Sequence, residues 1–264
     1  AAEVGCNTFL LEKGSELGGL ASLISKIPAK NRLADFPHYL MHRAEQLENL
    51  YIFTNTEGTP ENIRKFHPNI IVSSTGSAPL LPPIAGLKDR IDNEDYNIYS
   101  ILGMINHIND FPKDLEGKKV VVVGGGAVGL DVVEFFADRN ADISIVEMMD
   151  QIGRDLDPVS KNDTKAMMKK HNVHQLTKTA LLEVKDSSFL VKGDGEPYEI
   201  PFEYGFVCLG MRAQGQLYQN LTEEFSSEDV EIMNIGDSQR ARRIIDGTQE
   251  GRNILTILEQ RGYL

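Results

Sequence analysis

The chain has 264 residues, a formal net charge of −12 and a sequence isoelectric point of about 5.0. This acidic balance argues against a nucleic-acid partner, because no basic stripe could offset the repulsion from phosphates. Hydrophobic residues make up 41% of the chain, which is enough for packed cores, and the length suits two domains of ordinary size. No apolar run approaches the roughly 20 residues that a membrane span needs, so we expect no membrane partner.

The first strand is expected at 7–11, and it ends in the acid Glu12. In a dinucleotide-binding unit such an acid follows a strand, a glycine loop and a helix by about 20 residues. We therefore expect that the glycine loop of a first dinucleotide motif is truncated away, with Ala1–Glu3 as the last turn of the missing helix and Gly5 as the turn after it. Residues 1–11 also lack the basic leader and cleavage site of a signal peptide.

The only two cysteines, Cys6 and Cys208, lie far apart in the sequence. Each falls in an apolar, strand-like run, which is typical of a small buried hydrophobe rather than a redox thiol. No C-x-x-C is present, which excludes a dithiol relay and a cysteine-ligated iron–sulfur cluster within this chain. This cysteine usage indicates a reducing cytoplasm as the location.

A glycine turn at Leu17–Leu20 follows the first acid and, taken alone, is an ordinary loop. The segment Phe36–Leu50 is predicted to form an amphipathic helix. His38 and His42 lie four residues apart in it, but they are not part of an H-E-x-x-H motif, so we predict no metal site and assign no catalytic histidine. A strand is expected at Asn69–Ser74.

Proline and glycine in the segment 82–87 interrupt regular structure. The next segment, 89–114, is polar and mixed, and we expect it to cross to the following domain. The chain then enters the stretch that is most informative about its function.

The central stretch combines all the parts of a nucleotide-binding β-α-β unit. Lys118–Val123 is an apolar, β-branched run of the kind found in strands that are buried on both faces. The sequence GGGAVG at 124–129 follows at once and fits G-x-G-x-x-G. A helix is expected at Val128–Asp138 and ends where Asn140 can take a left-handed turn. A second buried strand at 143–146 leads into Glu147.

This order predicts a pyrophosphate site with defined residue roles. Gly124 permits the tight strand-to-helix turn, Gly126 lets the backbone approach a pyrophosphate, and Gly129 lets helix and strand pack closely. The free N–H groups and positive dipole at the helix start would hold the phosphates. Glu147 is placed to accept from a ribose 2′-OH, which favours NAD(H) over NADP(H), although Arg154 is close enough in sequence to keep NADPH open. The alternative is a glycine-rich turn in an α/β protein that binds no ligand.

Further elements are expected after this unit. A helix is predicted at Lys161–His171, followed by a short strand at Val173–Leu176. An antiparallel meander with a turn at Gly193–Gly195 is predicted from three runs, Ala180–Val184, Ser188–Lys192 and Glu196–Ile200. The chain closes with predicted strands at Tyr204–Gly210 and Val230–Ile235, then Gly236-Asp237, and a helix at Ile244–Gln260.

The chain resembles the C-terminal part of the NADH:flavin oxidoreductases of the 2-enoate reductase and 2,4-dienoyl-CoA reductase type. In that family an old-yellow-enzyme barrel is fused to FAD and NAD(P)H domains. The similarity extends over essentially the whole chain. It is carried by Glu12-Lys13 with Leu17-Gly18-Gly19, Pro28-Ala29-Lys30, Ser74–Pro79, the loop at 124–129 with Val146-Glu147-Met148, Leu209–Arg212, Ile235–Asp237 and Ala241–Gly247.

This resemblance implies an α/β fold with two Rossmann-like, glutathione-reductase-like three-layer domains. An NAD(H)-binding domain at 108–224 would be inserted into a discontinuous FAD-binding domain at 1–107 and 225–264. For FAD, the resemblance implies that Glu12 holds the adenosine ribose near Lys13, Gly18 and Gly19, that Thr75 and Gly76 pass close by, and that Asp237 beside Gly236 binds the ribityl or pyrophosphate part. For NADH, it implies binding by Gly124, Gly126, Ala127, Val128, Gly129 and Glu147, with Gly210 flanking the nicotinamide half.

The sequence departs from the family pattern in three ways. The FAD glycine loop is absent, and so is the barrel, with its FMN, its iron–sulfur ligands and its enoate-reducing acid. Ala213 replaces the proline that usually follows Gly-x-Arg. We therefore do not expect this piece alone to reduce an enoate.

The function implied is that of an electron-entry module, which passes a hydride from NADH to FAD and then electrons to a barrel domain or another acceptor. This chemistry belongs to the cofactors, so we name no catalytic side chain. Two alternatives stay open. One is a truncated nucleotide-binding fragment without turnover, and the other is a small NADH diaphorase or oxidase that reduces oxygen or quinones.

Overall fold

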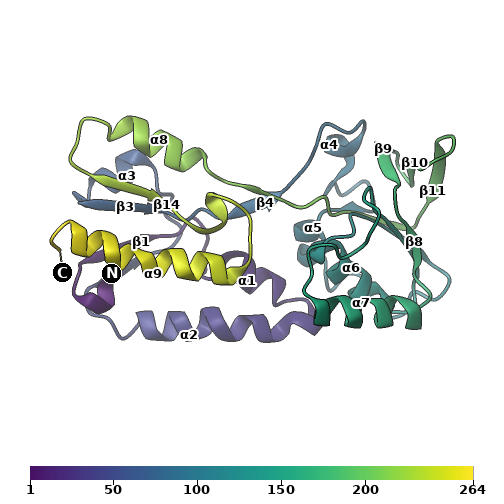
Figure 1. The fold of residues 1–264 in the computed structure, drawn as a ribbon, viewed down its shortest axis with the longest axis horizontal. Coiled ribbons are helices and arrows are strands. Elements are labelled where there is room, and N and C mark those ends of the chain that lie inside the picture. The colour runs from purple at the N-terminus through teal and green to yellow at the C-terminus, as the bar shows by residue number, and fades with distance from the viewer. Residues whose placement is uncertain (264) are drawn as a thin grey trace. The chain divides into compact units, whose positions relative to one another are not determined.

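The computed structural model describes residues 1–263, and the chain divides into two compact units (Figure 1). Unit 1 is discontinuous and comprises Ala1–Ser25, Lys30–Ala78 and Met211–Leu264. Unit 2 comprises Lys26–Ala29 and Pro79–Gly210. One unit is thus inserted into the other, but the unit boundaries differ from the expected domain limits. Residues 79–107 group with unit 2, and residues 211–224 group with unit 1.

Unit 2 is built on a five-stranded sheet in which all pairings are parallel. Its central strand, β6 (Lys119–Val123), has four valines that are 0–3% exposed. Parallel sheets are covered on both faces, which is why their strands are continuous apolar runs. The strand order is β5 (Ile98–Tyr99), β12 (Tyr204–Val207), β6, β7 (Asp142–Val146) and β8 (His174–Leu176).

One face of this sheet packs against α6 (Ala127–Ala137), which follows β6 directly. Phe136 on α6 is fully buried and lies 4.8 Å from the ring of Phe206 and 5.1 Å from that of Phe111. Asn140 has a φ of 61° and gives the expected left-handed turn after the helix. The other helices of this unit are α4 (Leu87–Arg90), α5 (Ile101–Asn106) and α7 (Pro158–Lys170).

The opposite face is covered by an antiparallel meander of β9 (Ala180–Val184), β10 (Ser188–Lys192) and β11 (Tyr198–Pro201). Phe189 and Val191 of β10 are fully buried and belong to the same apolar cluster as Val121, Val123 and Val146 of the sheet. The meander predicted from the sequence is therefore present. Unit 2 consequently has three layers: helices, a parallel sheet and a small antiparallel sheet.

Unit 1 contains two separate pairs of parallel strands. β1 (Thr8–Leu11) pairs with β2 (Leu50–Phe53), and β3 (Ile70–Ser73) pairs with β14 (Glu231–Asn234). A short pair joins β4 (Ser77–Pro79) to β13 (Met211–Ala213). The helical elements are η1 (Ala2–Val4), α1 (Gly19–Ile24), η2 (Pro28–Ala34), α2 (Asp35–Ala44), α3 (Pro60–Arg64), α8 (Gln216–Glu224), η3 (Gly236–Ser238) and α9 (Ile244–Gln260).

The core of unit 1 is small. Ile71 of β3 packs with Leu221 and Phe225, which lie on and just after α8. By contrast, apolar side chains on β1 and β2 remain open, with Phe9 40% exposed and Tyr51 45% exposed. The two strand pairs of this unit are therefore much less covered than the sheet of unit 2.

Two predicted segments differ from the structure, and helix α8 was not predicted. The helix expected over 36–50 ends at Ala44, because Leu50–Phe53 pairs with β1 instead. The segment 89–114 is not a simple crossing: it contains β5 and α5. Ser100 caps α5 by accepting from the N–H of Gly103 at 3.1 Å, and Ile101, Met104 and Ile105 are buried. Helix α8 had no counterpart among the expected elements.

Within residues 1–263, no helix is both long and apolar enough to cross a membrane.

Candidate functional site

The turn between β6 and α6 requires glycine at two positions. Gly124 has a φ of +108°, and a Cβ there would lie 2.1 Å from the carbonyl oxygen of Cys208. A Cβ on Gly129 would lie 1.9 Å from the carbonyl oxygen of Gly124. Both positions therefore exclude a side chain, for the reasons of turn conformation and close packing that the motif predicts.

Gly126 differs from these two glycines because a Cβ there would meet no atom within 4 Å. It is the N-cap of the 11-residue helix α6, and no side chain caps this helix end. Ala127 and Val128 form the first turn behind it. The free N–H groups at this end, together with the helix dipole, suit an anion that approaches over Gly126.

Glu147, directly after β7, is fixed against the glycine loop by two backbone amides. Its Oε2 accepts from the N–H of Gly125 at 2.6 Å, and its Oε1 accepts from the N–H of Met149 at 2.7 Å. An ionised carboxylate offers about four acceptor positions, so two remain for further donors such as ribose hydroxyls. The structure thus brings together the acid and the loop that the sequence predicted as partners.

The loop and the acid line a shared cleft of about 270 Å³. The side chains that complete it, Met149, Gln151, Arg154 and Asp155, all belong to the segment that follows β7. Of these, the sequence singled out only Arg154. The other three could have been found from their place in the sequence, directly after a parallel strand. Ligands of parallel sheets bind outside the carboxyl ends of the strands, where this segment lies.

Gly210 lies at the end of unit 2, just after β12. It has a φ of +99°, and its carbonyl oxygen accepts from the N–H of Leu80 at 2.9 Å. Cys208, two residues earlier, is buried, and desolvation raises the pKa of its thiol to about 12. The thiol is therefore protonated at neutral pH and unsuited to redox chemistry.

The residues predicted to bind FAD lie in unit 1, at the carboxyl ends of its parallel strands. Glu12 follows β1, and its Oε1 accepts from the N–H of Gly14 at 2.6 Å. Lys13 is exposed and pairs with Glu57 at 3.2 Å. Gly18 and Gly19 both have positive φ, at 104° and 50°, where the chain enters α1.

The last residue of β3 has an unsatisfied hydroxyl, and the segment after β3 has open backbone. Thr75 donates its hydroxyl to the carbonyl oxygen of Gln214 at 2.5 Å. Gly76 has a φ of +73°, and a Cβ there would meet nothing within 4 Å. The hydroxyl oxygen of Ser73 is buried and has no hydrogen-bond partner within residues 1–263. Such an unpaired buried group is costly, so it is a fitting place for a polar ligand group.

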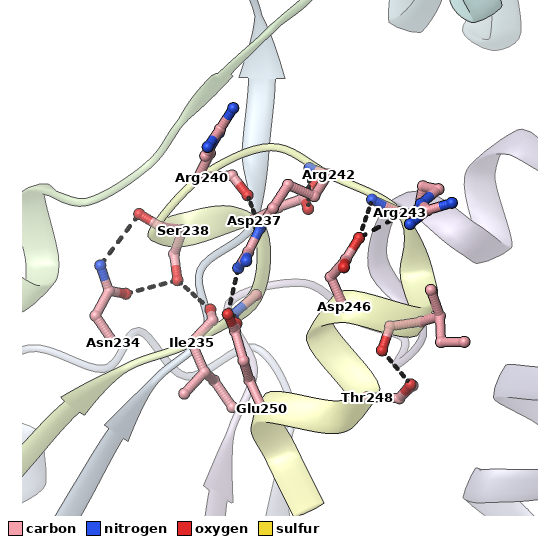
Figure 2. A network of polar contacts seen from close by, with 12 residues as sticks. Asn234, Ile235, Asp237, Ser238, Arg240, Arg242, Arg243, Asp246, Thr248 and Glu250 are labelled. Carbon is pink, nitrogen blue, oxygen red and sulfur yellow. Dashed lines mark hydrogen bonds and ion pairs between the residues drawn. The ribbon is translucent and has the colours of Figure 1, made fainter. Parts of the chain in front are cut away.

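Asp237, in η3 after β14, belongs to a polar network that extends into the first turns of α9 (Figure 2). Its Oδ2 accepts from the hydroxyl of Ser77 at 3.0 Å, and its Oδ1 accepts from the N–H of Arg242 at 3.0 Å. Glu250 accepts from the N–H of Gly236 at 2.6 Å and pairs with the Arg242 guanidinium, which holds the pKa of Glu250 below its usual range. Sequence reasoning missed Ser77 and Glu250, because only the tertiary fold brings them to this loop.

The chemical types of these unit 1 residues are suited to the adenosine, pyrophosphate and ribityl parts of FAD. Acids follow β1 and β14, open backbone follows β3, and the Ser73 hydroxyl lacks a partner. The described residues of this unit include no G-x-G-x-x-G turn between a strand and a helix. Over residues 1–263, no three His, Cys, Asp or Glu side chains gather as a metal site would require.

Known proteins resemble this chain over most of its length. The family model described as pyridine nucleotide-disulphide oxidoreductase matches residues 47–233. An NADH oxidase of Thermoanaerobacter brockii is 25% identical over 95% of this chain and 37% of its own length. A metal reductase of Desulforamulus reducens is 26% identical over 96% of this chain and 40% of its own. The solved 2-naphthoyl-CoA reductase superposes with a TM-score of 0.79 at 23% identity, covering 95% of this chain and 36% of that one.

The chain therefore spans about two fifths of the length of these relatives. The relationship to the fused flavin reductases inferred from the sequence motifs is confirmed, and so is the glutathione-reductase-like α/β fold. The family works with FAD and NAD(H). On the match over residues 47–233, this chain belongs to the pyridine nucleotide-disulphide oxidoreductase family.

Proposed function

We propose that this chain is the part of a longer flavoprotein through which electrons enter from NADH. Family membership supports an oxidoreductase, and the single observation that carries the finer proposal is the cleft of unit 2. There, the open backbone at Gly126 and the carboxylate of Glu147 line one cavity of about 270 Å³. This pairing is what a dinucleotide needs, since one feature takes the pyrophosphate and the other takes the ribose.

In this proposal the chain's residues bind and orient rather than react. The amides at the start of α6 hold the pyrophosphate of NADH, and Glu147 accepts from the adenosine ribose. In unit 1, Glu12 binds the adenosine ribose of FAD, and Asp237 binds its ribityl or pyrophosphate part. The backbone at Thr75 and Gly76 passes close to the same cofactor. The redox step is a hydride transfer from NADH to FAD, and the two cofactors supply it themselves. Alignment and exclusion of water are then the protein's contribution, so no side-chain acid or base is required.

An anaerobic titration of the FAD-loaded chain with NADH tests the proposal. We expect the visible flavin absorbance to disappear at about one equivalent of NADH. The same titration of Gly126→Ala, loaded with FAD to the same level, is the matched control, and its flavin should be reduced more slowly at the same NADH concentration. Flavin that stays oxidised in the wild-type protein, although NADH binds, would refute electron entry.

A second candidate is a nucleotide-binding fragment without turnover. It is favoured by the contrast between the two units: five large apolar side chains on β1 and β2 are 36–45% exposed, whereas the valines of β6 are 0–3% exposed. If unit 1 does not hold FAD, the purified chain will be colourless and will still bind NADH. A yellow protein that bleaches with NADH excludes this candidate.

The electron acceptor is a separate part of the proposal. A barrel domain of the enoate-reductase type is one candidate, and oxygen is another, because an NADH oxidase is among the relatives. Oxygen consumption by the FAD-loaded chain with NADH distinguishes them, since rapid consumption favours the oxidase and slow consumption favours a protein acceptor.

A further inference from the structure

Two methionines follow directly after Glu147, and they are more open to solvent than the other methionines of the chain. Met148 is 68% exposed and Met149 is 38% exposed. Among the others, all of which lie within residues 1–263, Met104 and Met168 are buried and the rest are half-buried. The thioether groups that a dissolved oxidant reaches most easily therefore lie next to the acid of the NADH cleft.

Met149 differs from Met148 because its side chain lines the cleft itself. Among the residues that line the cleft within the described part of the chain, it carries the one large apolar side chain, since the others are glycine, charged or amide residues. A thioether is polarizable and packs well against aromatic rings. Met149 is therefore the side chain of this cleft that is best suited to contact the adenine of NADH.

The backbone holds Met149 at this position. Its N–H donates to Oε1 of Glu147 at 2.7 Å, and its carbonyl oxygen accepts from the N–H of Lys178 at 2.9 Å. Further along the same segment, the N–H of Gly153 donates to the carbonyl oxygen of Gly125 at 2.7 Å. A chemical change at the Met149 side chain consequently acts inside the cleft.

We propose that Met149 is a site of oxidation by hydrogen peroxide and that its sulfoxide weakens the binding of NADH. In this step the O–O bond of the peroxide breaks and an S–O bond forms at the thioether. The sulfur is oxidised, the peroxide is reduced, and water leaves. The sulfoxide is polar, so it must lose its hydration when the adenosine of NADH covers it, whereas the thioether has almost none to lose.

The proposed function also supplies a source of the oxidant. Hydrogen peroxide forms when a reduced flavin passes two electrons and two protons to oxygen, which is one candidate acceptor of this chain. Oxidation of Met149 then slows the entry of electrons from NADH when oxygen consumes them. The oxidation itself follows from the exposure of the side chain, but its effect on NADH rests on the proposed function.

Peptide mass mapping and calorimetric titration of the full chain, before and after a short treatment with hydrogen peroxide, test the two parts. We expect Met148 and Met149 to gain one oxygen each while Met104 and Met168 stay reduced. The Kd for NADH should then rise about fivefold or more, which is the usual effect of desolvating one unpaired polar group. Saturating NAD⁺ during the treatment should protect Met149 but not Met148.

Met149→Leu and Met148→Leu are the matched variants, and each is compared with itself before and after peroxide. Met149→Leu should keep its own Kd for NADH, because leucine has no thioether, and Met148→Leu should lose affinity as the wild-type protein does. An equal rise in Kd for Met149→Leu would overturn the inference. So would an unchanged Kd in wild-type protein that is oxidised at Met149, or a Met149 that reacts no faster than Met104. Wild-type protein that binds no NADH before treatment would instead overturn the proposed function, while the mass map still decides whether Met149 is oxidised.

Discussion

Alanine at either of two glycines of the G-x-G-x-x-G motif should have different effects: one substitution should weaken NADH binding, and the other should destabilise the fold. At Gly129, an added Cβ would lie 1.9 Å from the carbonyl oxygen of Gly124, so helix and turn must move apart by about 1.5 Å to reach an ordinary 3.4 Å contact. At Gly126, the added Cβ meets no protein atom within 4 Å, and the backbone φ of −78° accepts alanine. We therefore expect Gly129→Ala to damage the fold and Gly126→Ala to damage the site.

The expected magnitudes follow from these distances. For Gly129→Ala, overpacking against the backbone should lower the free energy of unfolding by about 2–3 kcal/mol. The better helix propensity of alanine should raise it by about 1 kcal/mol. The net loss of about 1–2 kcal/mol corresponds to a Tm lowered by about 2–8 °C. For Gly126→Ala, a weaker N-cap and a less flexible unfolded chain offset each other, so the stability should stay within about 1 kcal/mol.

NADH binding should be weakened more by Gly126→Ala than by Gly129→Ala. The methyl group of Gly126→Ala occupies the space through which a pyrophosphate reaches the helix amides. Losing one hydrogen bond to a charged group costs about 1.5–3 kcal/mol, which raises the Kd for NADH about 10- to 150-fold. Calorimetric titration with NADH and thermal unfolding followed by circular dichroism measure the two effects. If Gly126→Ala binds NADH as the wild-type protein does, the pyrophosphate does not lie over this glycine.

Three further predictions concern the fold and its titratable groups. Phe136→Ala removes a fully buried ring and should lower the free energy of unfolding by about 3–5 kcal/mol in urea. At pH 8 a thiol reagent should label Cys6 alone in the native protein and also Cys208 in denaturant, because burial raises the pKa of Cys208 to about 12. Asp157→Ala should lower the Tm at neutral pH but not in strong acid. Hydrogen bonds from Ser160 hold the pKa of Asp157 below its ordinary value, so this carboxylate stabilises the fold above its unfolded pKa and stops doing so as the pH falls through the folded pKa.

Each of these predictions has an outcome that would contradict it. A loss below about 1 kcal/mol for Phe136→Ala would mean that the aromatic cluster refills the space. Rapid labelling of Cys208 in the native protein would show that β12 opens readily. A Tm difference for Asp157→Ala that persists in strong acid would show that the residue acts through packing rather than through its charge.

Elements whose residue pattern is local were predicted correctly from the sequence. The bounds predicted for β9, β10 and α9 are those of the structure, and the strands and helix around the glycine loop differ by one residue at each end or less. These elements have strong periodicity and clear turn residues. The helix predicted over 36–50 failed at its end, because pairing of Leu50–Phe53 with β1 outweighed a helical pattern. Helix α5 was missed because its cap and its apolar residues lie in a segment of mixed composition.

By itself, the sequence determined the β-α-β unit, its glycine turn and the acid at the end of the second strand, because spacing along the chain alone places these parts. Only the tertiary structure decided which side chains share the cleft with them. Gln151 and Asp155 join the cleft on the segment after β7, which contacts the glycine loop through the backbone of Gly153. Ser77 reaches Asp237 from a segment far away in the sequence, and Glu250 reaches the N–H of Gly236 from the middle of α9. Contacts between different segments depend on how the strands and loops pack, and the residue pattern of one segment does not determine this packing.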